Sequence, residues 1–199
     1  MSSHQRTVKV VGPHSTGKKT LMGTMLYMCG LDLRELEQLQ KDGIDAYDKI
    51  IGYYHKNGLT PVFTAKSGMM RFADSPQADG LIYVLDATGS KDAILHSGQV
   101  FTQSECEMFK ATGSLILVVN KMDAVDWSRE KYEQVVAPAI QQLKSVGLSP
   151  EKIQVVPISA KKGDNILERS ANSPWHRVAE SSPQGDETSG TLFAYLDQI

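Results

Sequence analysis

The stretch Gly12-Pro-His-Ser-Thr-Gly17-Lys18 decides the fold of this 199-residue chain. It fits the pattern G-x-x-x-x-G-K, follows a β-branched run at Val8–Val11, and precedes apolar residues at helical spacing in 20–29. Between a strand and a helix, such a loop turns backbone N–H groups toward phosphate oxygens, and the helix N-terminus adds partial positive charge. We therefore predict a phosphate-binding loop in which Lys18 bridges the outer phosphates. Its candidate residues are Gly12, His14, Ser15, Thr16, Gly17, Lys18, Lys19 and Thr20.

One position of this loop departs from the motif. The lysine of a phosphate loop is ordinarily followed by Ser or Thr, whose hydroxyl ligates Mg²⁺. Here the position holds Lys19, whose ammonium cannot coordinate a metal, and Thr20 lies about 100° further round the helix axis. We expect phosphate binding to survive and Mg²⁺ binding to be weakened or lost. Lys19 either supplies part of the missing metal charge or points into solvent, and His14 either touches phosphate or caps the loop.

Two further motifs follow strand-like apolar runs. Asn120-Lys121-Met122-Asp123 fits N-K-x-D, in which the Asp carboxylate accepts hydrogen bonds from guanine N1–H and the exocyclic amine, a donor pair that adenine lacks. Ser159-Ala160-Lys161 fits the companion S-A-K loop, whose backbone N–H approaches guanine O6. Ligands of open α/β sheets bind at the carboxyl ends of the strands, where both motifs lie. The predicted guanine-binding residues are Asn120, Lys121, Asp123, Ser159, Ala160 and Lys161.

The order of these segments predicts an α/β fold. The strand-like runs lie at 8–11, 60–66, 69–74, 81–85, 115–119 and 153–157. The helix-like segments lie at 20–29, 33–40, 99–111, 129–146 and 191–199. Residues 41–58 show no clear pattern, and 170–190 are expected to form a loop. The later alternation implies a P-loop GTPase-like, doubly wound, mostly parallel sheet of about six strands.

Composition limits the classes of function. The chain is 41% hydrophobic and 22% charged, and its net charge of -2 argues against nucleic-acid binding by overall positive potential. Its two cysteines, Cys29 and Cys106, form no C-x-x-C pair and are expected to be reduced. No apolar leader or membrane-length run is seen, so we expect a cytoplasmic protein with no membrane or DNA partner. His55, His96 and His176 lack metal-ligand spacing and are expected on the surface.

A family resemblance extends over nearly the whole chain. The segments that carry it are Gly12–Gly30, Gln77–Ile82, Val119–Asp123, Val125–Trp127 and Gly163–Trp175. With these segments the chain resembles the G domain of the elongation factor 1-alpha group, which includes the termination-factor GTPase and the ribosome-rescue GTPase that partners pelota. The resemblance implies GTP or GDP as the ligand, and the ribosome or proteins of translation and RNA quality control as partners. Residues 1–199 are expected to form a single G domain without β-barrel domains; the natural protein either lacks them or is longer.

The resemblance breaks in the segments that act on the γ-phosphate. Gly58-Leu59-Thr60 resembles switch I, so Thr60 is a candidate for sensing that phosphate. Asp74-Ser-Pro-Gln77 resembles the start of switch II, but Gln77 replaces the family's phosphate-reading glycine and the water-positioning histidine is absent. The chain passes at once to Ala78, so the switch II helix is expected to be missing. Gln77 either positions water itself or belongs only to a short connection.

Together these features predict guanine-nucleotide binding with impaired or absent hydrolysis. Phosphoryl transfer depends on positioned water and on charge compensation, and both are altered in this sequence. We expect a binding or scaffold module in translation or in ribosome and mRNA quality control, and we assign no catalytic residue. Two alternatives stay open: an active GTPase with an unusual or partner-supplied catalytic residue, and a pseudo-GTPase that binds no nucleotide.

Overall fold

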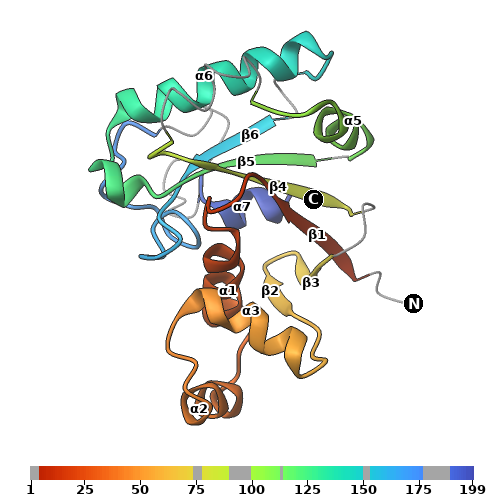
Figure 1. Ribbon diagram of the computed structural model, residues 1–199, viewed down its shortest axis with the longest axis vertical. Coiled ribbons are helices and arrows are strands. Elements are labelled where there is room, and N and C mark those ends of the chain that lie inside the picture. Colours follow the sequence, from red (N-terminus) through yellow and green to blue (C-terminus); the bar gives the residue numbers. More distant parts are fainter. Residues whose placement is uncertain (1–4, 74–77, 90–99, 113, 150–152, 177–188) are drawn as a thin grey trace.

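The computed structural model describes residues 5–73, 78–89, 100–112, 114–149, 153–176 and 189–199. Its centre is a six-stranded sheet in the order β2-β3-β1-β4-β5-β6 (Figure 1). The strands are β1 (Arg6–Val11), β2 (Val62–Ala65), β3 (Gly68–Phe72), β4 (Gly80–Asp86), β5 (Ser114–Asn120) and β6 (Ile153–Pro157). Every neighbouring pair is parallel except the β2–β3 hairpin. The predicted α/β fold with a mostly parallel sheet is confirmed.

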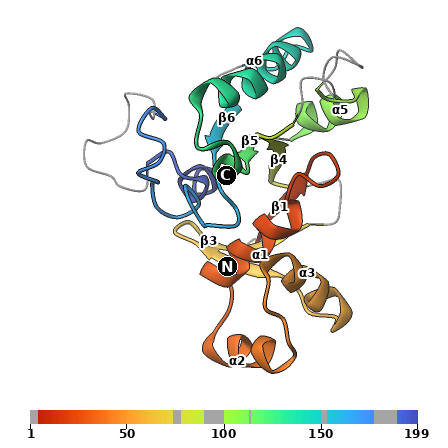
Figure 2. The ribbon, with the colours of Figure 1, turned by 60° about the vertical axis from the view of Figure 1, so that its left-hand side comes forward.

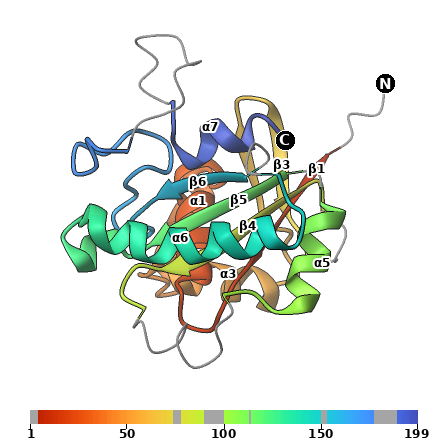
Figure 3. The same cartoon turned by 90° about the horizontal axis from the view of Figure 1, so that it is seen from above.

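Helices cover both faces of the sheet. They are α1 (Lys18–Cys29), α2 (Leu33–Lys41), α3 (Tyr47–Lys56), α5 (Gln103–Ala111), the 3₁₀ helix η1 (Met122–Val125), α6 (Arg129–Ser145) and α7 (Leu192–Leu196). Helices α1, α3 and α7 lie on one face, and α5 and α6 lie on the other (Figures 1 and 3). In β4, Ile82 and Val84 are buried in the first core, whereas Leu81, Tyr83 and Leu85 are buried in the second. A strand buried on both faces is therefore seen in the sequence as an unbroken apolar run.

Helix α3 lies in the segment that showed no clear sequence pattern. Tyr47, Ile50, Ile51 and Tyr54 follow helical spacing, and the last three are buried. Gly52 interrupts this pattern, and a glycine lowers helix stability by about 1 kcal/mol relative to alanine. Packing against the rest of the protein therefore stabilises α3 more than its own helix propensity does.

The contact between α1 and α3 depends on a glycine in α1. A Cβ atom built on Gly23 would lie 1.8 Å from the carbonyl oxygen of Tyr47, and real Cβ atoms essentially never come within 3.0 Å of such an atom. The backbone at the start of α3 therefore rests directly on α1. This contact holds the first turn of α3 beside α1, the helix that follows the phosphate loop.

The connection between β3 and β4 is short because of the strand register. Phe72, the last residue of β3, and Gly80, the first residue of β4, both pair with Val8 of β1. The backbone N–H of Ala73 continues this pairing by donating to the carbonyl oxygen of Val8 at 2.9 Å. Since β3 ends at the level where β4 begins, a short connection is enough to join the two strands. Asp74 and Gln77, which carry the expected switch II remnant, lie outside the described residues.

The helix boundaries follow local capping chemistry. Helix α5 begins at Gln103 because the Thr102 hydroxyl accepts from the Glu105 N–H, while the Glu105 carboxylate accepts from the Thr102 N–H. The sequence-based start at Gln99 lies outside the described residues. No helix in the described part of the chain is both long and apolar enough to cross a membrane.

One of the three histidines contradicts its expected place on the surface. His55 is exposed, and His96 lies outside the described residues. His176 is buried, with Nε2 3.3 Å from the carbonyl oxygen of Gly190 and its ring against that of Tyr132. Burial lowers the pKa of His176. Its burial depends on tertiary packing because the loop around it has no apolar periodicity.

The Gly23 contact predicts the result of two glycine substitutions. Gly23→Ala is expected to destabilise the domain by about 2–3 kcal/mol, because the new methyl group meets a backbone carbonyl that cannot rotate away. The control is Gly52→Ala in α3, where a Cβ meets nothing within 4 Å. That variant is expected to gain up to about 1 kcal/mol. Urea unfolding followed by circular dichroism measures both, and equal stability of the two variants would contradict the close packing.

Candidate nucleotide-binding site

The phosphate loop needs glycine at both of its ends. Gly12 has φ 135° and Gly17 has φ 93°, values that L-residues with side chains rarely adopt. A Cβ on Gly12 would also lie 2.4 Å from the carbonyl oxygen of Val84 in β4. Between the glycines, Ser15 is left-handed at φ 62°, and its hydroxyl lies 2.7 Å from Nδ1 of His14. These positive φ values turn the chain back on itself and form the concave loop.

Lys18 reaches back across the phosphate loop. Its ammonium donates to the carbonyl oxygen of Gly12 at 2.7 Å and also to that of Pro13. Partial burial lowers the pKa of Lys18. Lys19, the next residue of α1, is exposed. The Lys18 ammonium is thus held over the carbonyl oxygens of the loop.

One buried amide joins the phosphate loop to both guanine motifs. Asn120 Nδ2 donates to the carbonyl oxygen of Thr16 at 2.9 Å, and its Oδ1 accepts from the N–H of Ala160 at 2.9 Å. The residue is 2% exposed. A Cβ on Gly17 would lie 2.3 Å from Asn120 Nδ2, so this glycine is also what allows the close approach.

Lys121 makes the second connection between the loops. Its ammonium donates to the carbonyl oxygen of Ser15 at 2.7 Å and pairs with the Asp86 carboxylate at 2.6 Å. Burial acts to raise the pKa of Asp86, but hydrogen bonds from Lys121 and Thr88 outweigh it, so the pKa lies below its ordinary value. The Lys121 stem is thereby stretched from the end of β5 to the phosphate loop.

A cavity of ≈ 780 Å³ lies where these loops meet α1 and α3. The sequence-predicted residues that line it are Gly17, Thr20, Asn120, Lys121, Asp123, Ala160 and Lys161. Ser159 is buried behind the wall, where its hydroxyl accepts from the N–H of Lys162 at 3.2 Å. The structure thus brings the guanine motifs to one cavity together with Gly17 and Thr20, whereas the other phosphate-binding candidates are not among its lining residues: Gly12, His14, Ser15, Thr16, Lys18 and Lys19.

The switch candidates are not among the residues of this cavity. Tyr47 and Asp48, at the start of α3, line it. The ten residues of α3 span about 15 Å, and Thr60 follows the far end of that helix in an exposed position. Asp74 and Gln77 lie outside the described residues. In the described part of the chain, no three His, Cys, Asp or Glu side chains gather in a group that could hold a metal ion.

One wall of the cavity is built from residues that the sequence motifs do not predict. This wall consists of Tyr27, Asp45, Ala46, Tyr47 and Asp48. The rings of Tyr27 and Tyr47 meet edge to face with centroids 5.1 Å apart. The helical spacing of apolar residues that begins at Tyr47 indicates a helix there. It does not indicate which end of that helix faces the cavity.

The bridging amide predicts a measurable loss of local order. Asn120→Ala leaves the Thr16 carbonyl and the Ala160 N–H without their partner in a buried place, so we expect a loss of about 2–4 kcal/mol of stability. Hydrogen exchange should show faster exchange at the Ala160 amide. The control is Asn172→Ala at an exposed position, which is expected to leave both measurements unchanged. Unchanged protection of Ala160 in Asn120→Ala would contradict the bridge.

The chain is similar in sequence to elongation factor 1-alpha proteins. The protein of Aureobasidium pullulans is 28% identical over 223 residues, which cover 96% of this chain and 49% of the relative. That of Blastobotrys adeninivorans is 26% identical over 227 residues with the same coverage. The chain thus spans about half the length of these relatives. Both alignments are longer than the 199-residue chain, so they contain gaps in it.

Solved structures and a family profile agree with this similarity. A structure of sup35 complexed with GMPPNP matches with a TM-score of 0.69 and 25% identity over 98% of this chain and 44% of that chain. The S. cerevisiae Ski7 GTPase-like domain, bound to GDP and inorganic phosphate, shares the fold with a TM-score of 0.69 and 18% identity over 96% of this chain and 49% of that one. The profile described as "Elongation factor Tu GTP binding domain" matches residues 67–198, more than half of the chain. The chain therefore belongs to the elongation factor Tu GTP-binding domain family and is a translation-factor-type G domain.

Proposed function

We propose that this G domain binds GTP or GDP in the ≈ 780 Å³ cavity and hydrolyses GTP slowly or not at all. The observation that carries the proposal is the Asn120 amide, which holds the phosphate loop and the S-A-K loop at one cavity. We further propose that residues 1–199 act as one G domain, a cytoplasmic binding or scaffold module in translation or in ribosome and mRNA quality control. The similarity to elongation factors, sup35 and Ski7 supports this role.

The guanine end of the cavity is read by complementary hydrogen bonds. The Asp123 carboxylate accepts from guanine N1–H and the exocyclic amine, and the stretched stem of Lys121 lies along the base plane. The backbone N–H groups of the S-A-K loop face guanine O6. At the other end, the phosphates replace the carbonyls that the Lys18 ammonium now contacts, and the backbone N–H groups of the loop share their charge.

Impaired hydrolysis follows from three features of the chain. Exposed Lys19 stands where the family has the hydroxyl that ligates Mg²⁺, and an ammonium cannot coordinate a metal, so Mg²⁺ binding is weakened. Thr60 lies beyond the far end of α3, away from the cavity wall. Only seven residues, 73–79, separate β3 from β4, a spacing from which we infer that the switch II helix is missing. Positioned water and charge compensation dominate phosphoryl transfer, so their loss lowers hydrolysis far more than binding.

The base reader gives the sharpest test of binding. Asp123→Asn replaces a double acceptor with an amide whose N–H₂ faces the guanine amine, so GDP affinity is expected to fall about 100-fold. Xanthosine diphosphate carries a carbonyl where guanine has its exocyclic amine, so Asp123→Asn should bind it more tightly than the unaltered chain does. Isothermal titration with GDP, XDP and ADP measures the change. The control is Asp126→Asn, a left-handed position that asparagine tolerates. Loss of GDP affinity in both variants, or binding of ADP as tightly as GDP, would refute guanine reading.

The role of Lys19 is tested by restoring the hydroxyl. The natural chain is expected to bind GTP with an affinity that changes less than about 3-fold between EDTA and Mg²⁺, because an ammonium replaces part of the metal's charge. Lys19→Ser should make GTP binding at least about 10-fold tighter with Mg²⁺ than without it. Lys56→Ser, at an exposed position far along α3, is the control.

Two outcomes would overturn this part of the proposal. Binding by the natural chain that collapses in EDTA would show that Lys19 does not replace the metal. Multiple-turnover GTP hydrolysis by the natural chain alone would show that it is an active GTPase. Absence of GDP and GTP binding in either buffer would leave a nucleotide-free interaction module.

A further inference from the structure

Helix α2 carries an apolar face that the described chain does not cover. Leu33, Leu36 and Leu39 belong to this helix, but only Leu39 is buried, and Leu33 is 79% exposed. Figures 1 and 2 show α2 standing away from the sheet at the end of the molecule. An amphipathic helix of a globular protein ordinarily packs its apolar face against other elements. The face of α2 that points toward α1 is therefore open to a further partner.

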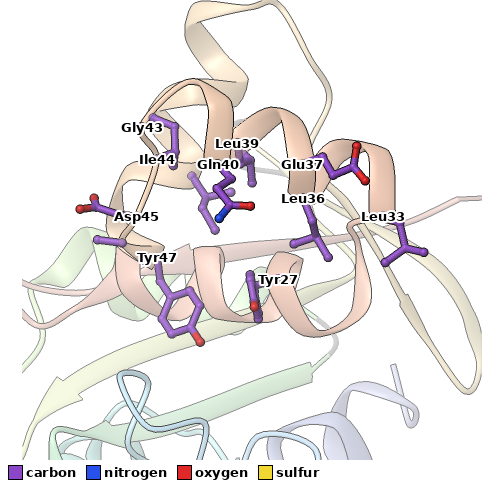
Figure 4. A pocket seen from close by; sticks show the side chains of 12 residues that line it. Tyr27, Leu33, Leu36, Glu37, Leu39, Gln40, Gly43, Ile44, Asp45 and Tyr47 are labelled. Atoms are coloured by element: carbon purple, nitrogen blue, oxygen red, sulfur yellow. The ribbon is translucent and has the colours of Figure 1, made fainter.

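A cavity of ≈ 530 Å³ separates α2 from α1 and from the start of α3 (Figure 4). We call it the α2 groove, and its apolar walls include Tyr27, Leu33, Leu36, Leu39, Ile44 and Tyr47. Figure 4 shows Leu36 and Gln40 pointing from α2 into this space, on the side of Tyr27. The volume is in the range of pockets that accept a few side chains or a small ligand.

The surroundings of the α2 groove are acidic. Residues 32–49 contain six acidic and three basic side chains, a net charge of −3, whereas the whole chain carries −2. Glu37 and Asp45 line the groove itself. Lys49 pairs with Asp45 at 2.5 Å and offsets part of its charge, so Glu37 is the main source of negative charge in the lining of the groove. The groove therefore presents apolar walls inside a negative rim, which favours a positively charged partner.

We propose that the α2 groove binds a basic amphipathic helix of a partner protein. Helix α2 has nine residues, about 13 Å, which matches two to three turns of a helix laid beside it. Apolar side chains of the partner at i, i+3 or i+4, and i+7 contact the exposed leucines and Tyr27, and its Lys or Arg residues face Glu37 and Asp45. A second copy of this chain fits less well, because an isologous contact would bring two acidic rims together.

The α2 groove lies on the outer side of the wall that bounds the candidate nucleotide cavity. Tyr27, Asp45, Ala46 and Tyr47 line both spaces. The occupant of the groove therefore contacts the wall without entering the cavity. Binding at this separate surface does not require nucleotide, so the full chain is tested without nucleotide.

The test uses two labelled helical peptides of about 14 residues that differ only in charge. Both carry Leu at positions 1, 4, 8 and 11; one has Lys and Arg on the flanks and the other has Glu at the same places. Fluorescence anisotropy is expected to give a Kd in the range of about 1–50 μM for the basic peptide and at least about 10-fold weaker binding for the acidic one. The affinity of the basic peptide should fall as salt is raised.

Variants of the chain locate the binding surface. Leu33→Ser and Glu37→Lys are each expected to weaken binding of the basic peptide at least about 5-fold. Glu37→Lys should also strengthen binding of the acidic peptide. The matched control is Met69→Ser in β3, an apolar residue that is 59% exposed and lies outside the groove. Equal binding of the two peptides, no saturation by the basic peptide up to about 1 mM, or an equal effect of Met69→Ser would overturn the proposal. So would sedimentation that shows a dimer of the chain dissociated by Leu33→Ser, because the occupant would then be a second copy.

Discussion

A single buried side-chain amide, that of Asn120, holds together the edge of the sheet where the candidate site lies. Its two polar groups bond to Thr16 and Ala160, residues that belong to loops after β1 and β6. Because a buried amide without partners is costly, the loops can depart from this arrangement only at a substantial loss of free energy. Gly17, at φ 93°, allows the close approach of Asn120, and Lys121 makes a second connection to the phosphate loop.

The register of β1 with its two neighbours brings the end of β3 level with the start of β4. β3 pairs with the first half of β1 and β4 with the second half, so both meet at Val8. A short connection is therefore enough to join β3 to β4. Under the proposed function, a shortened segment here removes parts that respond to the γ-phosphate, while Asn120, Lys121 and Asp123 keep their places in the described site.

The wall built from α1 and the start of α3 has a different surface on each side. Tyr27 and Tyr47 bound the candidate nucleotide cavity, and the same rings bound the acidic α2 groove. Gly23 allows α1 and α3 to approach closely enough to form this wall. A domain with little or no hydrolysis can still present such a surface to partners, which agrees with a binding or scaffold role.

By itself, the sequence determined the ligand chemistry and the fold class. G-x-x-x-x-G-K, N-K-x-D and S-A-K are local motifs, and the apolar runs before them indicate strands, so the sheet and most of the site residues could be predicted. Only the tertiary structure decided that Asn120 joins three loops, that Tyr47 forms a cavity wall, that Thr60 lies away from it and that His176 is buried. These features join residues far apart in the sequence. Their proximity follows from strand order, register and helix packing, which the local pattern of apolar and polar residues does not specify.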